Sequence, residues 1–196
     1  MNKKNNVGLI VGGASPEREV SKSSGKSIYE ALQNLNYNVY IFDPGLGNHR
    51  KLDESYFNSA EDPKLISSKN YIDLFSSDSL KSVDTAFIAL HGTYGEDGMI
   101  QSLFELNKIK YTGSGVLASA LSMNKGLTKV LLQHNNVPTP KWIILENQHS
   151  NIEEIKKNIE VNIFYPCVVK PNDQGSAIGL TICKSENENK DAIKLA

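Results

Sequence analysis

Three segments of the sequence carry side chains that could do chemistry, and each one follows an apolar run. The first, Gly12–Glu19, combines two glycines with the carboxylate of Glu17. The second begins at His91 and contains three glycines within eight residues. The third, Lys170–Gly179, begins with a lysine and continues mainly in small and polar residues. Because open α/β sheets bind ligands beyond the carboxyl ends of their strands, these segments are the expected ligand-binding loops.

Residue type alone leaves two roles open for Glu17 and for His91. Glu17 fits the first turn of a helix, where the helix dipole stabilises a carboxylate by about 0.3–1 kcal/mol, and the residues alone favour this role. The alternative is a fixed anion for a cationic substrate group. His91 follows a strand, so it should be exposed at the edge of the sheet, either as a reactive group or as a hydrogen-bonding partner of its own loop.

The segment that begins at Lys170 suits a phosphate group. A lysine ammonium is a compact charge for phosphate oxygens, and glycines such as Gly175 and Gly179 let backbone amides come close to a ligand. An ordinary polar hairpin loop could have the same composition. The pattern therefore predicts a phosphate cradle only in combination with other motifs.

Two further glycine patterns imitate nucleotide-binding motifs. Gly25–Ser27 resembles the end of a P-loop, but Val20 stands where the leading glycine should be, so we reject it. Gly113–Ala118 fits the dinucleotide pattern G-x-G-x-x-A, yet the later stretch Val130–Val137 has no acid to hold a ribose. We interpret this pattern as tight packing of a helix on a sheet. A non-catalytic or dinucleotide-binding Rossmann module stays as the alternative from another class.

The first part of the chain must supply the sheet that presents the first two loops. Apolar runs between turn residues predict strands at Val7–Val11, Val39–Phe42, Thr85–Leu90 and Ile109–Thr112. Helical spacing predicts helices at about 16–35, 100–106 and 116–120, the first with Ser15 as N-cap and Pro16 after it, the second capped by Asp97. Between 45 and 81 we expect at most one short helix. Alternating strands and helices predict parallel crossovers, and hence an α/β, doubly wound, Rossmann-like sheet.

The pattern changes after Met123. Helices are expected at about 127–134, at 152–159 and from 187 onward, and a strand at Trp142–Leu145. Two more strands, Cys167–Lys170 and Leu180–Cys183, are joined by a polar loop that contains glycine. This is the pattern of a hairpin rather than a crossover, so we expect a second, α+β domain here.

Composition limits the other classes of protein. The 196 residues carry 21 basic and 22 acidic side chains, so no basic field attracts nucleic acid or a membrane surface. The apolar run after Met1–Lys4 is too short for a signal peptide, and no run would span a bilayer, so we expect a cytoplasmic protein. The four histidines are scattered, and no metal cluster is expected. Cys167 and Cys183 are interpreted as two buried thiols rather than a disulfide.

Together the motifs resemble those of one family, the D-alanine–D-alanine ligases. Val11–Ser21 resembles the opening motif of these enzymes, and Ala89–Gln101 resembles their second motif. Tyr111–Lys125 is similar nearly residue for residue, and Val169–Gly179 looks like their mobile phosphate loop. The resemblance covers essentially the whole chain, and the combination of motifs in this order is highly specific.

The resemblance implies an ATP-grasp ligase of peptidoglycan precursor synthesis, with an N-terminal pre-ATP-grasp domain over residues 1–122 and an incomplete ATP-grasp subdomain over 123–196. In this family ATP phosphorylates the carboxylate of a first D-alanine, and the amine of a second D-alanine attacks the acyl phosphate. The resemblance also implies Mg²⁺, with its ligands beyond Ala196. We therefore expect an N-terminal part of a longer enzyme, inactive alone.

The resemblance assigns roles to individual residues. Glu17 would hold the ammonium of the first D-alanine, Ser176 would join it in a hydrogen-bonded network, and His91 would line the substrate site. The residues expected to bind ATP phosphates are Lys125, Lys170, Gly175, Ser176 and Ala177. A homodimer through the N-terminal domain is retained as a candidate assembly.

Two positions depart from the family pattern. Asn124 stands where an aspartate is usual, and Ala177 stands where a second serine is usual, which removes one hydroxyl donor. The residues that select the second substrate are expected beyond Ala196. The sequence therefore leaves D-alanine, D-lactate and D-serine open as that substrate.

Overall fold

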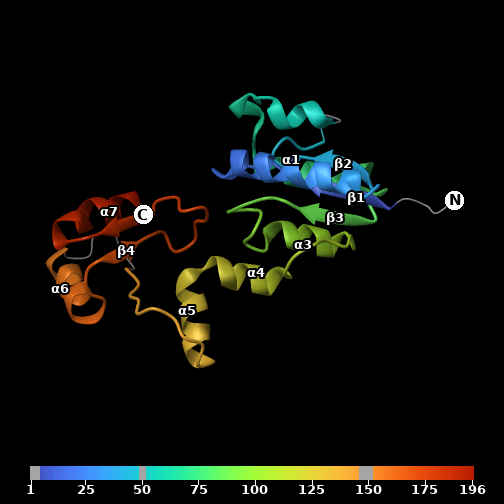
Figure 1. Cartoon of the computed structure of the whole chain (residues 1–196). Coiled ribbons are helices and arrows are strands. Elements are labelled where there is room, and N and C mark those ends of the chain that lie inside the picture. The colour runs from blue at the N-terminus through green and yellow to red at the C-terminus, as the bar shows by residue number, and fades with distance from the viewer. Residues whose placement is uncertain (1–4, 49–51, 146–151) are drawn as a thin grey trace. The chain divides into compact units, whose positions relative to one another are not determined.

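The computed structural model describes residues 5–48, 52–145 and 152–196, and of residue 152 only the backbone. The chain divides into two compact units, residues 1–120 and 121–196 (Figure 1). We call them unit 1 and unit 2 and describe each by itself.

The sheet of unit 1 is parallel, as predicted. Its central strand is β1 (Asn6–Ile10), which lies between β2 (Asn38–Phe42) and β3 (Thr85–Ile88). The register pairs Leu9 with residue 41 of β2 and residue 87 of β3. Both neighbours run parallel to β1, so the carboxyl ends of the three strands meet at one edge of the sheet.

Both faces of the sheet are covered, because side chains of a strand alternate between faces. Leu9 packs into one buried cluster together with Tyr56 and Phe57, and Ile28 of α1 (Arg18–Asn34) lies against that cluster. Ile10 packs into a second cluster, formed with α2 (Asn70–Ser76) and α3 (Met99–Leu106). The doubly wound arrangement is therefore confirmed.

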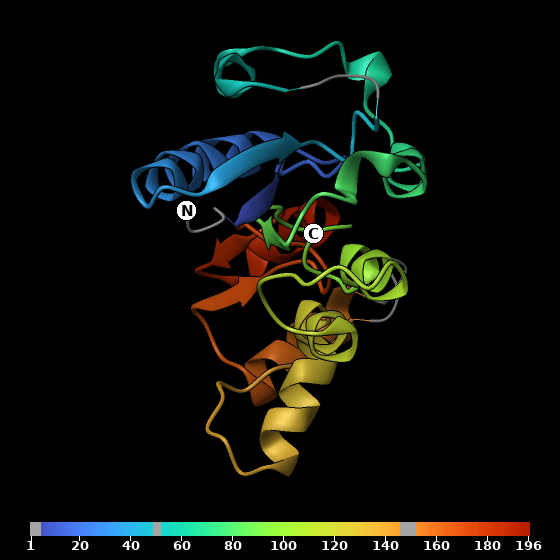
Figure 2. The ribbon, with the colours of Figure 1, turned by 90° about the vertical axis from the view of Figure 1, so that its right-hand side faces the viewer.

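The segment after β2 contains more local structure than predicted. Besides α2 it forms three short 3-10 turns, η1 (Glu54–Asn58), η2 (Pro63–Leu65) and η3 (Asp78–Leu80). Figure 2 shows the stretch with η1 and η2 on the opposite side of the sheet from α3. Side chains of Asp53, Asp62 and Ser77 accept backbone hydrogen bonds at the starts of these turns, which explains why a polar sequence folds here.

Two predictions for unit 1 are wrong in detail. Ile109–Thr112 is not a strand but a single parallel bridge between Ala86 and Tyr111, because only one pair of backbone bonds forms there. Helix α1 begins at Arg18 rather than near Pro16, since Ser15 first closes a tight turn by accepting the Arg18 amide at 3.2 Å. Helix α4 (Val116–Met123) follows the bridge.

Unit 2 is an α+β unit, as predicted. Its strands β4 (Cys167–Val169) and β5 (Thr181–Cys183) pair antiparallel, and its helices are α5 (Lys125–His134), α6 (Ile152–Asn162) and α7 (Asn189–Leu195), the last preceded by η4 (Glu186–Glu188). The core of the unit joins Ile155, Ile159 and Ala192 to the two cysteines. Both cysteines are free and buried, which confirms the thiol interpretation.

The strand expected at Trp142–Leu145 is wrong. Within the described part of unit 2, residues 141–145 have no strand pairing, because β4 and β5 pair with each other. Ile143 and Leu145 nevertheless pack against the core of the unit. The apolar pattern therefore predicted correctly that side chains of this segment contact the core, but it did not predict the backbone conformation.

Candidate functional site

The loop after β1 reverses direction through two glycines with positive φ. Gly12 has φ +78° and Gly13 has φ +79°, a conformation that L side chains rarely adopt. A Cβ at Gly12 would lie 2.3 Å from the hydroxyl of Tyr56, and one at Gly13 would lie 2.7 Å from that of Tyr71. Glycine is needed at both positions for conformation and for space, and the chain can turn directly into the segment that carries Glu17.

Glu17 is buried at this edge of the sheet, with a relative exposure of 2 %. The Glu17 amide donates to Ser15 Oγ at 3.2 Å, and Ser15 Oγ donates to the carbonyl oxygen of His91 at 2.8 Å. The serine side chain therefore joins the loop after β1 to the loop after β3. Parallel strand order explains this meeting, because β1 and β3 are neighbours.

Gly92 brings the His91 loop into contact with the Glu17 carboxylate. A Cβ at Gly92 would lie 2.3 Å from Glu17 Oε1, so only a glycine lets the backbone come this close. The Gly92 amide donates to Glu96 Oε2 at 2.7 Å, which holds the loop in place. The result is a buried carboxylate that lies directly against the backbone of a glycine.

The imidazole of His91 has polar groups near both nitrogens. Its Nε2 lies 3.0 Å from Ser24 Oγ, and its Nδ1 lies 3.9 Å from Glu96 Oε1. The side chain is 30 % exposed, in agreement with the expected place at the edge of the sheet. The ring is thus oriented and can meet a ligand beside Glu17.

A buried ion pair lies behind the glycine turn. Arg18 and Asp43 form a salt bridge in which the Asp43 side chain is fully buried, and Tyr56 donates to Asp43 Oδ2 at 2.7 Å. Burial alone would lower the pKa of Arg18, but the hydrogen bond and charge of Asp43 outweigh burial and raise it. Burial, followed by the charge of Asp43, raises the pKa of Tyr56 above its usual range. Tyr56 is therefore a neutral donor to a charged pair.

In unit 2, the first turn of α5 holds the loop that follows β4. The Lys125 amide donates to the carbonyl oxygen of Asn172 at 3.0 Å, and the Gly126 amide donates to Asn172 Oδ1 at 2.9 Å. Lys125 Nζ donates to the carbonyl oxygen of Gln174 at 2.6 Å. The start of the predicted phosphate-binding loop is therefore hydrogen-bonded to α5, the helix that carries Lys125, one of the predicted phosphate-binding lysines.

The later part of this loop is exposed and tightly turned. Ser176 has φ +45° and Ala177 has φ +60°, both in the left-handed region, and the Ile178 amide donates to the carbonyl oxygen of Gly175 at 3.0 Å. Lys170 is exposed at the end of β4. These features suit a loop that rearranges around an anion, because little packing holds it.

A second lysine lies within electrostatic range of Lys170. Burial and then the positive charge of Lys170 lower the pKa of Lys129. Lys129 Nζ donates to Thr139 Oγ1 at 2.5 Å. Ammonium groups that repel each other are stabilised by a shared anion, so this end of the hairpin is electrostatically suited to phosphate.

The structure thus groups the predicted site residues within each unit. It brings Glu17 to the His91 loop in unit 1, and Lys125 to the loop that follows Lys170 in unit 2. That these groups form one site stays a prediction. Sequence reasoning gave no role to Arg18, Asp43, Ser24 or Asn172. One feature of the sequence could have indicated the pairing of Arg18 with Asp43, since these opposite charges stand at the ends of predicted elements. No local sequence pattern, however, shows that the two residues pair.

The glycines of the dinucleotide pattern do not pack tightly, so our interpretation of them is wrong. A Cβ at Gly113 would have nothing within 4 Å, and one at Gly115 would meet its nearest atom at 3.8 Å. Gly113 instead has φ +112°, which requires glycine for conformation. The rejected P-loop pattern, by contrast, does lie inside α1, as predicted.

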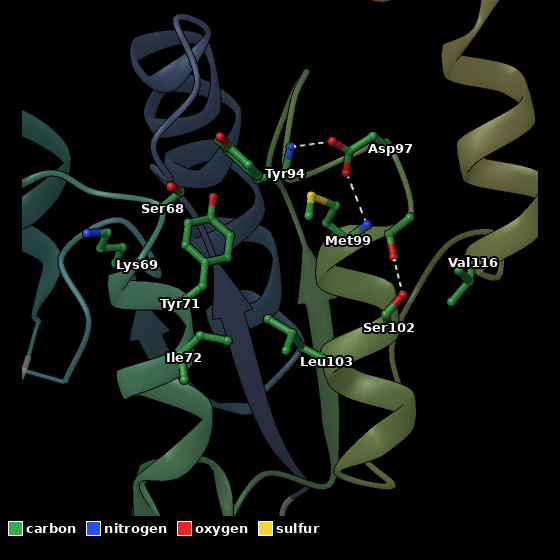
Figure 3. Close-up of a pocket in the computed structure, with 11 residues that line it drawn as sticks. Ser68, Lys69, Tyr71, Ile72, Tyr94, Asp97, Met99, Ser102, Leu103 and Val116 are labelled. Carbon is green, nitrogen blue, oxygen red and sulfur yellow. Dashed lines mark hydrogen bonds between the residues drawn. The ribbon is translucent and has the colours of Figure 1, made fainter.

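A hollow of about 510 Å³ lies between α2 and α3, with neither Glu17 nor His91 in its lining. Figure 3 shows the ring of Tyr71 facing it and Asp97 accepting backbone bonds at its rim. The Tyr94 amide donates to Asp97 Oδ2 at 2.8 Å, and the Met99 amide donates to Asp97 Oδ1 at 3.1 Å. The N-cap of α3 is Gly98, however, so the prediction of Asp97 as the cap is wrong by one residue. The hollow borders the candidate loops: Tyr94, Asp97 and Gly98 of the His91 loop line it, and the hydroxyl of Tyr71 accepts from the Ala14 amide at 3.3 Å.

No helix in residues 5–48, 52–145 and 152–196 has the length and apolar character needed to cross a bilayer. In the same ranges no three His, Cys, Asp or Glu side chains are grouped so as to hold a metal ion.

Comparison with known proteins identifies the family. Residues 6–114 match the model of the D-ala D-ala ligase N-terminus, and residues 131–196 match that of the D-ala D-ala ligase C-terminus. A D-alanine–D-alanine ligase of Pelotomaculum thermopropionicum is 37 % identical over 193 residues, which cover 97 % of this chain and 52 % of that protein. The chain spans about half the length of the curated relatives it matches.

Solved structures agree with this assignment. D-alanyl-alanine synthetase A from Vibrio cholerae superposes with a TM-score of 0.75 at 25 % identity, over 100 % of this chain and 56 % of that one. The VanG D-Ala:D-Ser ligase from Enterococcus faecalis superposes with a TM-score of 0.67 at 26 % identity, over 99 % and 60 %. The fold, the glycine loops and these matches lead to one conclusion: the chain belongs to the D-alanine–D-alanine ligase family.

Proposed function

We propose that the product of the complete reading frame containing these residues joins two D-alanines at the expense of ATP, for peptidoglycan precursor synthesis. The observation that carries the proposal is the Glu17 carboxylate, 2 % exposed and walled by Gly92 at the carboxyl edge of the sheet. A carboxylate in this position suits the ammonium of an amino acid, because a desolvated site strengthens a charge-assisted hydrogen bond.

The proposed reaction has two steps. The carboxylate of the first D-alanine attacks the γ-phosphorus of ATP, which forms an acyl phosphate and releases ADP. The amine of the second D-alanine then attacks the acyl carbon, and the tetrahedral intermediate expels inorganic phosphate to leave the peptide bond. Both steps move negative charge, so positively charged groups and backbone amides are the expected stabilisers.

In this proposal unit 1 binds the first amino acid. Glu17 binds the ammonium of the first D-alanine, and His91, oriented by Ser24, lines the pocket near its carboxylate. We further propose that unit 1 is the pre-ATP-grasp domain and unit 2 part of the ATP-grasp domain. The positions of the two family matches support this assignment.

Unit 2 would receive the phosphates of ATP. Lys170 and Lys125 would neutralise them, and the backbone amides of Gly175–Ala177 would cover them. The exposed turn at 176–177 and the mutual repulsion of Lys129 and Lys170 support this proposal. The family also implies Mg²⁺, which would offset phosphate charge; no step here is derived through it.

Kinetics of two variants test the proposal on the product of the complete reading frame. Truncating one partner of a desolvated charge pair costs about 2–5 kcal/mol, so Glu17→Gln should lower kcat/KM for the first D-alanine roughly thirty-fold to several-thousand-fold. ATP affinity should barely change. Lys170→Ala should show the opposite bias and raise KM for ATP first. ADP release that depends on D-alanine is the measurement.

Two control variants come from the same elements. Glu19→Gln removes an exposed carboxylate from the first turn of α1, and Lys184→Ala removes an exposed lysine just beyond β5. Neither should change kcat/KM more than about three-fold, since exposed charges contribute little. If Glu17→Gln behaves like Glu19→Gln and only lowers the melting temperature, Glu17 is a helix-dipole residue and the proposed substrate site is wrong.

The choice of second substrate is part of the same test. One of the similar structures is named as a D-Ala:D-Ser ligase, so D-serine and D-lactate belong in the assay as competing acceptors. We propose D-alanine as the preferred acceptor because the curated relatives with about 37 % identity carry that name. A higher kcat/KM with D-serine or D-lactate would overturn this choice.

We also propose a cytoplasmic enzyme, because its phosphoryl donor ATP is held in that compartment, and a homodimer formed through unit 1. Ile72 and Met99, both at the hollow between α2 and α3, are 57 % and 55 % exposed. Apolar side chains in such a position favour association. Sedimentation should give a dimer that Met99→Lys weakens; a monomer at all concentrations would refute this assembly.

A further inference from the structure

The backbone of Gly13 is held on both sides by the buried ion pair. Its amide donates to Asp43 Oδ1 at 2.9 Å, and its carbonyl oxygen accepts from Arg18 Nη1 at 2.6 Å. The same guanidinium reaches Asp43 with both terminal nitrogens. Arg18 and Asp43 therefore form a closed clamp around one residue, and we call these two side chains the Gly13 clamp.

The clamp closes the segment that carries Glu17 into a ring. The Arg18 side chain returns to the carbonyl oxygen of a residue five positions earlier in the chain, so Gly13–Arg18 is bounded by a hydrogen bond at its ends. Inside this ring, Ser15 Oγ accepts from the Glu17 amide at 3.2 Å. The backbone of Glu17 has little freedom as long as both bonds persist.

Asp43 is itself fixed by two further donors. The Gly45 amide donates to Asp43 Oδ1 at 2.9 Å, and the Tyr56 hydroxyl donates to Asp43 Oδ2 at 2.7 Å. The side chains of Asp43 and Arg18 have relative exposures of 0 % and 9 %. A buried carboxylate that accepts five hydrogen bonds from four residues cannot rotate without leaving some of these donors unpaired, so the clamp is rigid.

A second ion pair lies beside the clamp but does not touch Gly13. Lys22 Nζ donates to Glu61 Oε2 at 2.9 Å, and both side chains are 2 % exposed. Glu61 also lies 3.5 Å from Arg18 Nη2. This pair shares the burial and charge of the clamp without its contacts to the glycine turn, which makes it a natural control.

We propose that Arg18 and Asp43 are positioning residues for the Glu17 carboxylate. By clamping Gly13 they fix where Glu17 meets the ammonium of the first amino acid. The inference rests on the proposed function of Glu17. Neither side chain touches substrate in this scheme. Arg18 is adjacent to Glu17 in the chain, and its guanidinium is bonded to Asp43 and to the Gly13 carbonyl oxygen.

The variant that tests the clamp is Arg18→Lys in the product of the complete reading frame. A lysine keeps the charge but lacks the planar fork that holds Asp43 and the Gly13 carbonyl together. A displacement of about 1 Å at a binding group can cost on the order of 10²-fold in rate. We expect kcat/KM for the first D-alanine to fall at least ten-fold, through KM, with KM for ATP within about two-fold.

Lys22→Met is the matched control. It removes a buried ion pair of the same network, so it should lower the melting temperature at least as much as Arg18→Lys while leaving KM for D-alanine within about two-fold. A role in stability alone would make both variants lose D-alanine affinity in proportion to their melting temperatures. That result would overturn the inference, as would an unchanged KM in Arg18→Lys.

Parallel assays of Glu17→Gln separate the two levels of the argument. If Glu17→Gln leaves the D-alanine kinetics unchanged, the proposed function fails, whatever Arg18 does. If Glu17→Gln impairs D-alanine use and Arg18→Lys does not, only the clamp fails. Should Arg18→Lys not fold, Tyr56→Phe loosens Asp43 more gently and must raise KM for D-alanine at least two-fold; an unchanged KM would refute the clamp.

Discussion

Replacing Gly92 by alanine should displace the Glu17 carboxylate, and so weaken its binding of the substrate, without removing its charge. The new Cβ would lie 2.3 Å from Glu17 Oε1, whereas a carbon and an oxygen in ordinary contact are about 3.3–3.6 Å apart. Either the carboxylate or the His91 loop must therefore move by about 1 Å. Such a displacement costs on the order of 10²-fold in kcat/KM for the first D-alanine.

The same substitution also has a cost in stability. Gly92 has φ +67°, and an L residue in the left-handed region is disfavoured by about 1–2 kcal/mol. That free energy lowers the melting temperature by a few degrees in a domain of this size. Gly92→Ala should thus remain folded at assay temperature, and thermal unfolding followed by circular dichroism checks this.

Gly113→Ala is the matched control, because it isolates backbone strain. Gly113 has φ +112°, and an added Cβ there would meet nothing within 4 Å. It should lose stability as Gly92→Ala does, with D-alanine kinetics within about two-fold of the parent. If both variants show the same kinetics, the contact between Gly92 and Glu17 does not govern substrate binding, and the reasoning from the glycine wall is refuted.

Two further predictions concern buried ionisable groups. Burial raises the pKa of Cys167 and Cys183, so a disulfide reagent at pH 8 should label them only as fast as unit 2 opens; rapid labelling of the folded chain would contradict this burial. Burial would raise the pKa of Glu61, but hydrogen bonds from Ser59 and Lys22 outweigh it and lower the pKa below its usual 4.5. Its contribution to stability is therefore present above pH 4.5 and lost as the pH falls through the lowered pKa. Glu61→Gln should cost about 3–5 kcal/mol in denaturant unfolding at pH 7 and progressively less in acid; a difference that does not depend on pH would refute the ion pair.

Periodicity predicted the elements that pack on one another. The spacing of apolar residues predicted the central strand, α1 and the cysteine hairpin, because burial of one face of an element imposes that spacing. The same signal failed at Trp142–Leu145, where Ile143 and Leu145 are partly buried against the core but the backbone has no strand partner in the described part of unit 2. Strand pairing is a property of two segments, and one segment alone does not contain it.

The candidate site divides in the same way. Glu17, His91 and Lys170 could be singled out because chemistry needs their residue types beside glycines. The Gly13 clamp could not, since Arg18 and Asp43 are 25 residues apart and meet only when β2 lies beside β1. A sequence motif can therefore predict a group that would contact a ligand. The residues that position this group can be identified only from the folded structure.

The first turn of α5 has a consequence for how an anion can bind beside it. The Lys125 amide donates to the carbonyl oxygen of Asn172, the Gly126 amide to Asn172 Oδ1, and the Leu127 amide to Asn124 Oδ1. These donors are the ones by which a helix terminus ordinarily recognises the shape of an anion, and all three are already occupied. An anion that binds here is attracted by the ammonium groups of nearby lysines instead. Its affinity should decline steeply with ionic strength, because screening acts on exposed charge within about 8–10 Å.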